Sequence, residues 1–280
     1  MEGSISTMLT AHSSQLTAHS SQLTAHSSQL TAHSSQLTAH SHAVLFLIAP
    51  AYNESQNIAQ FVEEWYPVVE KHDGEGLSRL VVIDDGSKDN TYAILQDLVK
   101  TRPLLQPLTK TNSGHGATCM YGYRYALEHG AEYIFQTDTD GQTSAQEFGA
   151  FWELRNEYDA VLGKRPERGD GASRKFVENV LRFILRLIFG VNVPDANAPF
   201  RLMKRGLLSK YLHKMPDDFN LPNVMLTTYF AYFHENVTFK AITFRPRQAG
   251  QNSINIRKII AIGLKAVKDF LQLRRNINHE

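Results

Sequence analysis

Two carboxylates stand two residues apart in segment 136–142, directly after an apolar run. At the end of a strand, Asp138 and Asp140 are close enough to share one divalent ion, with Gln142 as a further oxygen ligand. Such hard ligands suit Mg²⁺ or Mn²⁺ bridging a diphosphate. An Asp-x-Asp pair alone is common, so the prediction of a metal site depends on the motifs around it.

The earliest of the other polar motifs is segment 50–54, which follows the first apolar run of the chain body. Pro50 is expected to end a strand there, because proline cannot donate to a ladder. Tyr52 offers a flat face for stacking, and Glu54 offers a hydrogen-bond acceptor. By itself this segment is an ordinary strand-to-helix turn.

Two more motifs follow, in segments 84–91 and 112–116. Asp84 and Asp85 are two adjacent acids, more than a helix cap requires, and Asp89 can cap the next helix. The second motif is a glycine turn around Gly114, just before a predicted helix. It is either a cradle for phosphate at the helix N-terminus or simply a turn.

Strands and helices alternate through the body of the chain. Continuous apolar runs predict buried parallel strands, at residues 43–49, 79–84, 133–136 and 160–162. Apolar residues at helical spacing predict helices after the first two strands, at residues 58–69 and from about residue 89. The pattern predicts an α/β fold with a mostly parallel sheet, which binds ligands at the carboxyl ends of its strands. The polar motifs follow these strands, so we expect them to meet.

Together, the four motifs at 50–54, 84–91, 112–116 and 138–142 resemble the successive signatures of family 2 glycosyltransferases with the GT-A fold. The resemblance covers about residues 44–253. Later segments resemble the dolichol-phosphate mannosyltransferase and polyprenyl-phosphate sugar transferase branch, at residues 163–165, 173–175, 195–201 and 247–253. Two departures from that branch concern the acceptor: Ala198-Pro199 replaces the usual Ser-Gly, and segment 247–253 carries one extra residue.

The resemblance implies a metal-dependent enzyme of the hexosyltransferase type that uses a UDP- or GDP-sugar. Its fold would be a Rossmann-like, mostly parallel sheet flanked by helices. Asp138, Asp140 and Gln142 would hold Mg²⁺ or Mn²⁺, with Asp140 as a catalytic residue. The nucleotide sugar would contact a set of residues from all four motifs and the late arginine segment: Pro50, Tyr52, Glu54, Asp84, Asp85, Gly114, Asp138 and Arg247. Arg247 is equally compatible with a solvated surface position.

For the acceptor, two chemistries stay open. A polyprenyl phosphate needs cationic groups, and Arg165 and Arg174 match the branch's phosphate-binding positions, with Arg201 nearby. A sugar hydroxyl, as in lipopolysaccharide, needs a carboxylate base, which Asp218 would supply as the second catalytic residue. We expect the lipid phosphate, in the synthesis of a bacterial cell-surface glycan. Asp217 and Asp218 also fit a plain helix-entry loop.

Two helices carry basic amphipathic patterns. The first covers about residues 174–189, and the second is a C-terminal extension at residues 256–280. Such helices either lie on an anionic bilayer or pack their apolar faces on the sheet. The expected location is therefore cytoplasmic, at the inner face of the plasma membrane.

The first 42 residues differ from the rest of the chain. They repeat the heptapeptide Thr-Ala-His-Ser-Ser-Gln-Leu and contain no Lys or Arg. Such a segment buries too little apolar area to fold alone, so a disordered tail is predicted. The heptapeptide can be encoded by the seven-base unit ACAGCTC written three times. Slippage in that DNA would shift the reading frame, which predicts phase-variable expression.

Composition excludes several classes of protein. The chain has 280 residues, with 29 Lys and Arg against 28 Asp and Glu, so it lacks the charge of a nucleic-acid binder. A single cysteine, Cys119, fits a reducing compartment. No secretory signal is seen. We therefore expect a tail at 1–42, a GT-A domain at 43–255 and a helix at 256–280.

Two other functions remain as alternatives. A nucleotidyltransferase uses a similar sheet, but it would need a basic, glycine-rich loop after the first strand, and segment 50–54 is not one. A protein that binds a surface without catalysis is the alternative outside enzymes. The intact Asp138 and Asp140 argue against it.

Overall fold

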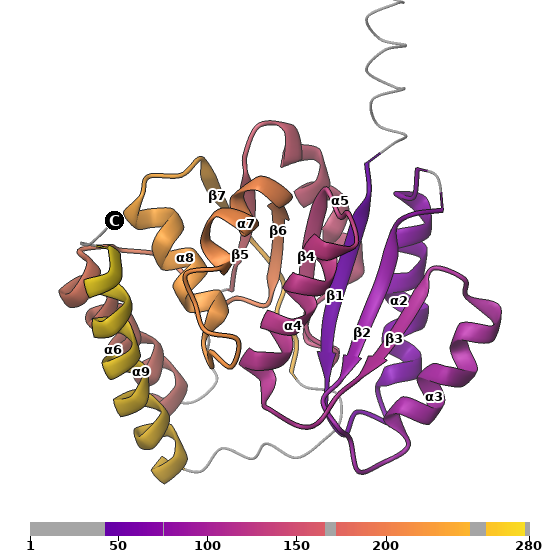
Figure 1. Cartoon of the computed structure of the whole chain (residues 1–280), viewed down its shortest axis with the longest axis horizontal. Coiled ribbons are helices and arrows are strands. Elements are labelled where there is room, and N and C mark those ends of the chain that lie inside the picture. Colours follow the sequence, from indigo (N-terminus) through magenta and orange to yellow (C-terminus); the bar gives the residue numbers. More distant parts are fainter. Residues whose placement is uncertain (1–42, 75, 166–171, 247–255, 278–280) are drawn as a thin grey trace, which may run out of the picture. The chain divides into compact units, whose positions relative to one another are not determined.

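The structure is a computed structural model that describes residues 43–74, 76–165, 172–246 and 256–277. For residues 172–176 and 256–262 it describes the backbone alone. The predicted tail at 1–42 and Arg247 lie outside the described residues. A seven-stranded sheet forms the centre of the fold (Figure 1). Its strands are β1 (Leu45–Ala51), β2 (Arg79–Asp84), β3 (Leu105–Thr109), β4 (Tyr133–Thr137), β5 (Ala160–Lys164), β6 (Phe200–Lys204) and β7 (Val237–Ala241).

The strand order is β3-β2-β1-β4-β6-β5-β7. β1, β2, β3 and β4 pair in parallel, β6 runs antiparallel between β4 and β5, and β7 pairs in parallel with β5. The mostly parallel α/β sheet predicted from the sequence is therefore present. The carboxyl ends of β1, β2 and β4 lie at one edge, which is where three of the four motifs begin.

Three strands were not predicted, and each has a physical reason. β3 contains Pro107, which is tolerated because β3 is an edge strand. β6 and β7 are short and each contains two polar residues, so their apolar signal is weak. The prediction that Pro50 ends its strand was wrong by one residue. β1 continues to Ala51, and Pro50 lies opposite Ile83 in the ladder.

The helices lie on both faces of the sheet (Figure 1). They are α2 (Ile58–Lys71), α3 (Thr91–Leu98), α4 (His115–Glu128), α5 (Phe148–Trp152), α6 (Ala172–Phe189), α7 (Arg205–Leu212), α8 (Pro222–Tyr232) and α9 (Ile256–Ile277). Short 3₁₀ turns lie at Val99–Thr101, Ala145–Glu147 and Glu153–Asn156. Helix α3 begins two residues after Asp89, whose carboxylate accepts the amide of Thr91 at 3.0 Å.

Each face of the sheet has its own core because successive strand residues point to opposite sides. On one face, Trp65 of α2 packs against Phe135 and Phe200, with ring centroids 5.5 and 5.9 Å apart. Phe148 of α5 contacts Phe135 on the same side, at 4.9 Å. Burying such large rings is the main favourable contribution to folding of this layer.

The other face is covered by α4, α7 and α8, whose buried residues form one cluster with Ile48 and Ile83 of the sheet. Helices α6 and α9 run side by side and join this cluster from outside (Figure 1). Their contact includes Phe189 and Phe270, whose ring centroids are 6.3 Å apart. Among the described residues, no helix combines the length and apolarity needed to cross a membrane.

Candidate active site

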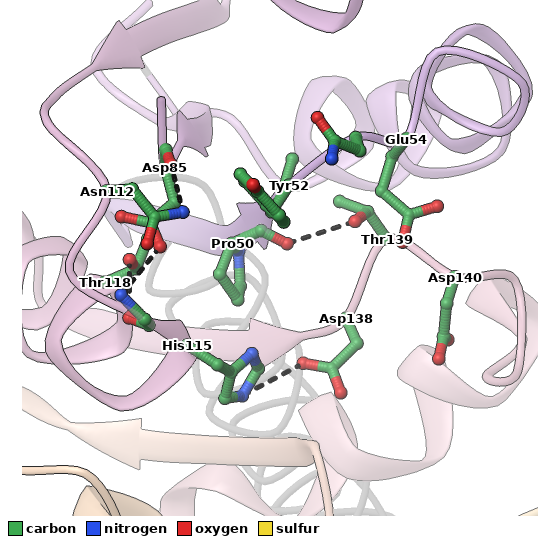
Figure 2. A pocket seen from close by; sticks show the side chains of 13 residues that line it. Pro50, Tyr52, Glu54, Asp85, Asn112, His115, Thr118, Asp138, Thr139 and Asp140 are labelled. Carbon is green, nitrogen blue, oxygen red and sulfur yellow. Dashed lines mark hydrogen bonds and ion pairs between the residues drawn. The ribbon is translucent and has the colours of Figure 1, made fainter. Parts of the chain in front are cut away.

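Residues from all four motifs line one cleft of about 820 Å³ at the carboxyl edge of the sheet (Figure 2). Most of the predicted donor-site residues are among them: Pro50, Tyr52, Glu54, Asp85, Gly114, Asp138 and Asp140. The cleft also contains Asn112, His115, Thr118 and Thr139, which the sequence did not single out. The parallel arrangement of β1, β2 and β4 brings these segments together.

Hydrogen bonds tie the first motif to the second. The amide of Asn53 donates to Ser87 Oγ at 2.9 Å, and the amide of Lys88 donates to Asn53 Oδ1 at 2.8 Å. The amide of Glu54 donates to Thr91 Oγ1 at 2.9 Å. These bonds join segments more than thirty residues apart in sequence. They hold the first motif against the turn after β2 and the start of α3.

Gly86 is required by this arrangement for two reasons. Its φ of +66° lies in the left-handed region, where residues with a side chain are strained. A Cβ on Gly86 would also lie 2.9 Å from the amide nitrogen of Asn112. The glycine therefore lets the second motif approach the third motif closely.

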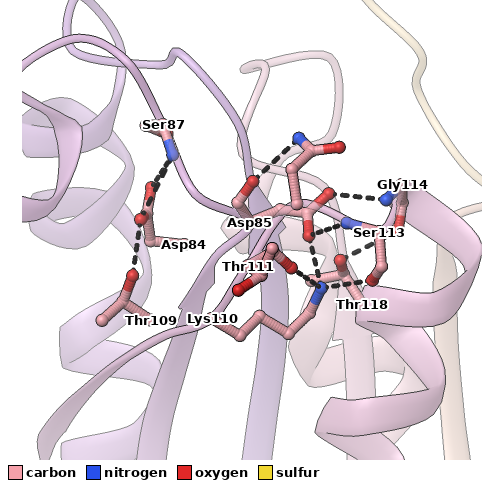
Figure 3. A network of polar contacts seen from close by, with 10 residues as sticks. Asp84, Asp85, Ser87, Thr109, Lys110, Thr111, Ser113, Gly114 and Thr118 are labelled. Atoms are coloured by element: carbon pink, nitrogen blue, oxygen red, sulfur yellow. Dashed lines mark hydrogen bonds and ion pairs between the residues drawn. The ribbon is translucent and has the colours of Figure 1, made fainter.

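Asp85 holds the third motif in place (Figure 3). Its carboxylate accepts the amides of Ser113 and Gly114 at 2.9 and 2.8 Å, and it is paired with the Lys110 ammonium. Burial alone would raise the pKa of Asp85, but the hydrogen bonds from Lys110 and the two amides lower it. Asp85 thus stays ionised and orders the turn before α4, in addition to lining the cleft.

Asp84 has a different position from the one predicted. Its side chain accepts the amide of Ser87 at 3.2 Å and the Thr109 hydroxyl at 2.9 Å, and it does not line the cleft (Figure 3). It therefore stabilises the turn after β2. Of the two acids that the sequence offered for the nucleobase, the structure brings Asp85 to the cleft.

Asp138 and Asp140 both line the cleft, on the segment that follows β4. Between them, Thr139 donates its hydroxyl to the carbonyl of Pro50 at 3.0 Å, which ties this segment to β1. Asp140 Oδ1 accepts the amide of Gln142 at 3.2 Å. The Gln142 side chain, however, donates to the carbonyl of Arg245 at 2.9 Å and is not a lining residue, contrary to its expected place in a metal site.

His115 is the main residue that sequence reasoning missed. It is the first residue of α4, and its Nε2 lies 3.8 Å from Asp138 Oδ1 (Figure 2). The same atom lies 3.6 Å from Cys119 Sγ. The pKa of His115 is raised, chiefly by Cys119 and also by Asp138 and Asp140. The imidazole is 58% exposed, so solvent screens this attraction. Its signal in the sequence was a polar side chain directly after the Gly114 turn.

The carboxylates of the cleft suit a hard cation that also binds a phosphate ligand. Among the residues that the structure describes, no three His, Cys, Asp or Glu side chains form a ready-made metal cluster. Mg²⁺ is commonly held by one or two carboxylates together with substrate phosphates. Asp138 and Asp140 both line the same open cleft, so they match that requirement.

The predicted acceptor residues are not gathered in one place. Arg165 forms a two-pronged ion pair with Asp195, with N···O distances of 2.7 and 2.9 Å, and Glu178 lies 3.5 Å away. Burial would raise the pKa of Asp195, but the hydrogen bonds and charge of Arg165 lower it. Arg165 is therefore already engaged by carboxylates. The side chain of Arg174 and all of Arg247 lie outside the described residues.

Arg201 does not agree with its expected contact to an acceptor. It is 0% exposed, and its guanidinium donates to the carbonyls of Ala198 and Asn223 and to Thr227 Oγ1, at 3.3, 3.1 and 3.2 Å. Buried arginine is kept where its donors are satisfied. Arg201 thus links β6 to the first turns of α8 and has no surface with which to meet an acceptor.

Asp218 lies outside the cleft. It is exposed and lines a separate groove along α4 with Lys110, Tyr121 and Arg124. Its neighbour Asp217 pairs with Arg124 at 2.6 Å. In this arrangement Asp218 is not beside Asp138 and Asp140, as a base at the donor sugar would be.

Comparison with known families gives one clear match. Residues 46–212 match the family model described as "Glycosyl transferase family 2". A UDP-N-acetylglucosamine–dolichyl-phosphate N-acetylglucosaminyltransferase of Methanococcus voltae is 26% identical over 185 residues, which cover 59% of this chain and 71% of the relative. A dolichyl-phosphate beta-glucosyltransferase of Trichomonas vaginalis is 33% identical over 174 residues, or 56% of this chain and 51% of the relative. Undecaprenyl-phosphate sugar transferases are also among the relatives. The chain thus spans about half the length of several relatives that it matches.

Among solved structures, the fold resembles that of glucosyl-3-phosphoglycerate synthase from Mycobacterium tuberculosis, crystallised with Mn²⁺, UDP and glucosyl-3-phosphoglycerate. The TM-score is 0.62 at 15% identity, and the match covers 84% of this chain and 81% of that one. At this identity the likeness concerns the fold.

Proposed function

Because the chain belongs to the family 2 glycosyltransferases, we propose that it transfers a sugar from a nucleotide-sugar donor to a polyprenyl phosphate. The observation that carries the proposal is the cleft in which all four motifs meet, with Asp138 and Asp140 on one wall. We name it the donor cleft. Relatives named as dolichyl-phosphate and undecaprenyl-phosphate sugar transferases support the acceptor.

In the donor cleft, each wall has a distinct task. The exposed ring of Tyr52 supports stacking of the nucleobase, and Asp85 lines the same cleft as a candidate acceptor for a base N–H. The start of α4 presents His115 and the positive end of the helix dipole toward the cleft, which favours the donor diphosphate. This arrangement suits a UDP- or GDP-sugar.

Asp138 and Asp140 are the residues that would hold a divalent ion beside the diphosphate. When bound, Mg²⁺ or Mn²⁺ neutralises the charge that develops on the leaving diphosphate. Crystals of the Mycobacterium tuberculosis synthase with Mn²⁺ and UDP support this choice of cofactor. The amide of Gln142 donates to the Asp140 carboxylate, and the hydroxyl of Thr139 ties the segment between the two acids to β1.

A lipid phosphate agrees better with this geometry than a sugar hydroxyl does. A hydroxyl nucleophile requires a base within hydrogen-bond reach, and Asp218 lies in a separate groove. A phosphate is already anionic and requires cations instead. Arg174 remains our candidate for that contact, because Arg165 is paired with Asp195. We name Arg165 and helices α6 and α9 the acceptor side.

We also propose that the acceptor side rests on an anionic membrane surface. Phe183 and Leu187 of α6 are 66% and 75% exposed, and Leu264 of α9 is 71% exposed. Basic residues alternate with them on the same two helices: Arg182, Arg186, Lys265 and Lys268. Apolar side chains flanked by lysine and arginine are typical of helices that lie in the bilayer interface. Phe270 is buried, so in this proposal one side of α9 packs on the domain while the side that carries Leu264 faces the membrane.

A pair of variants tests the acceptor. Arg174→Ala should lower transfer to undecaprenyl phosphate strongly, whereas Asp218→Asn should be tolerated. Both variants are assayed with the lipid phosphate and with a lipopolysaccharide acceptor, and Mn²⁺–UDP binding is the control for an intact donor cleft. If Asp218→Asn abolishes transfer while Arg174→Ala is active, a sugar hydroxyl is the acceptor.

The N-terminal repeat supports a further proposal, that expression of this bacterial surface-glycan enzyme is phase-variable. The tandem heptapeptide at the start of the chain is the supporting observation. Sequencing the gene from single colonies should find uninterrupted ACAGCTC units in varying copy number. Synonymous codons that break the seven-base period would contradict the proposal.

A further inference from the structure

A buried chain of hydrogen bonds leads from the interior of the fold to Asp138. Tyr123 of α4 donates its hydroxyl to Asn223 Oδ1 at 2.6 Å, and Asn223 Nδ2 donates to Gln136 Oε1 at 2.9 Å. Gln136 Nε2 then donates to Asp138 Oδ1 at 3.1 Å. Tyr123 and Gln136 are 0% exposed and Asn223 is 3% exposed. These three residues, which we name the relay, do not line the donor cleft.

The Asp138 carboxylate at one end of the relay determines which group donates in each of its hydrogen bonds. An ionised carboxylate only accepts hydrogen bonds, so Gln136 must present its NH₂ group to Asp138. Its carbonyl oxygen then faces Asn223, which must donate, and the remaining oxygen of Asn223 must accept from Tyr123. One consistent arrangement of the two amides therefore exists, and flipping either amide would set two like groups against each other.

The backbone that carries the relay is itself held by buried hydrogen bonds. Asn223 is the second residue of α8, and its carbonyl accepts from Arg201 Nη1 at 3.1 Å and from Thr227 Oγ1 at 2.8 Å. The buried arginine that looked like an acceptor residue thus fixes the backbone that carries Asn223. Gln136 is held in the ladder of β4, opposite Arg201 on β6.

We propose that Gln136 and Asn223 are positioning residues for the donor cleft, which orient the Asp138 carboxylate toward a divalent ion on the donor diphosphate. The inference rests on the proposed function and deepens it. Carboxylates that bind a metal are themselves commonly held by hydrogen bonds, and losing such a bond costs about 10–100-fold in metal affinity. The relay supplies that support from α4, α8 and β4 together.

The test measures Mn²⁺ binding to the full chain saturated with UDP, followed by loss of the free Mn²⁺ EPR signal. Gln136→Leu should raise the Kd for Mn²⁺ about tenfold or more. Asn223→Leu, one bond further from Asp138, should raise it less, and Tyr123→Phe least. The Kd for UDP without metal should stay unchanged in all three variants, because Asp138 is the group that the relay holds.

Thr228→Val is the matched control. Thr228 is equally buried on α8, but its hydroxyl donates to the carbonyl of Val224 and not toward the cleft. Its Kd for Mn²⁺ should equal that of the wild type even if its melting temperature falls. A purely structural role of the relay would lower the melting temperature of the three relay variants and leave the Mn²⁺ affinity of all four variants equal to that of the wild type. That result would overturn the inference.

Folding and function remain separable in this design. Should Asn223→Leu fail to fold, Gln136→Met and Tyr123→Phe decide by the same readout. Gln136→Met removes both relay bonds of Gln136, and Tyr123→Phe removes the one bond of Tyr123, each with little change of volume. A wild-type chain that binds no Mn²⁺ with UDP or GDP would overturn the proposed function, and the relay's role with it. Normal wild-type binding with unaffected relay variants overturns the relay alone.

Discussion

In the donor cleft, Asn53, Asp85 and Thr139 each join a segment that lies far away in the sequence. On the acceptor side, Arg165 pairs with Asp195, and Arg201, the other described arginine predicted to contact the acceptor, lies buried between β6 and α8. The first region presents its polar groups to an open space, whereas these two arginines of the second are committed to internal partners. Under the proposed function, the donor contacts are therefore preformed, and the acceptor contacts must come from residues other than these two arginines.

The largest effect expected in this comparison comes from Asp140→Asn. The change removes one charge with almost no change of shape, so the fold should persist. Losing a preorganised charge at a reacting group typically costs about 10²–10³-fold in rate, and sugar transfer should fall by at least that factor. The melting temperature should stay close to that of the wild type, because a substitution outside the packed core usually changes stability by no more than about 0.5 kcal/mol. Full activity of the wild type in EDTA would contradict the role of this residue.

His115→Ala sharpens the donor side of the comparison. A charge-assisted hydrogen bond is worth about 1.5–3 kcal/mol, so removing one from a diphosphate should weaken UDP-sugar binding roughly tenfold or more. His129→Ala is the control, because His129 is an exposed histidine just beyond the other end of the same helix. Calorimetric titration with the nucleotide sugar measures both. Equal affinities of the two variants for the nucleotide sugar would show that His115 does not contribute to donor binding.

Gly116→Ala tests how closely the start of α4 is packed. A Cβ on Gly116 would lie 2.2 Å from the carbonyl oxygen of Asn220, so the backbone before α8 would have to move. Overpacking of this kind costs about 1–3 kcal/mol, which lowers the melting temperature by several degrees. Gly149→Ala has nothing within 4 Å of the new Cβ and should leave the melting temperature nearly unchanged. The same shift in both variants would show that this contact is not tight.

The smallest expected effect on the donor cleft comes from the acceptor side. Asp195→Asn removes the charge that pairs with Arg165 and should leave Mn²⁺–UDP affinity within about twofold of the wild type, as for well-separated sites. Stability should fall at neutral pH. Since the pKa of Asp195 is lowered in the folded chain, its contribution is present above the unfolded value of about 3.9 and is lost as pH falls through the folded pKa.

Thermal unfolding between about pH 7 and pH 3 measures that contribution, because the range spans the unfolded pKa of aspartate. The gap in melting temperature between wild type and Asp195→Asn should narrow toward the acid end. A gap that is constant across the range would mean that the ion pair with Arg165 does not stabilise the fold. A large loss of Mn²⁺–UDP affinity would break the comparison between the two regions.

The same contrast explains what the sequence could predict. Apolar runs identified β1, β2, β4 and β5, and the parallel topology then brings the residues at their ends together without further information. β3 was missed because Pro107 weakens the strand pattern, and β6 and β7 because their short segments are partly polar.

Side-chain direction was harder to predict. Asp84 and Asp85 are adjacent in sequence, yet one stabilises a turn and the other lines the cleft, because successive residues point to opposite sides. Arg201 is buried because α8 covers its side chain and accepts hydrogen bonds from it. The packing of α8 on β6 is a long-range contact, which no local sequence pattern encodes. His115 was missed for a similar reason. It lies close to Asp138 only because the start of α4 packs beside the end of β4 in the folded chain.

The most direct test of the central claim is a transfer assay with the full chain. The protein is incubated with undecaprenyl phosphate in detergent, Mn²⁺ and a panel of UDP- and GDP-sugars, and the lipid fraction is analysed by mass spectrometry. We expect the mass of the lipid phosphate plus one sugar with at least one donor, and loss of that product in EDTA. If no donor yields this product while a lipopolysaccharide acceptor is glycosylated under the same conditions, the lipid-phosphate function is contradicted.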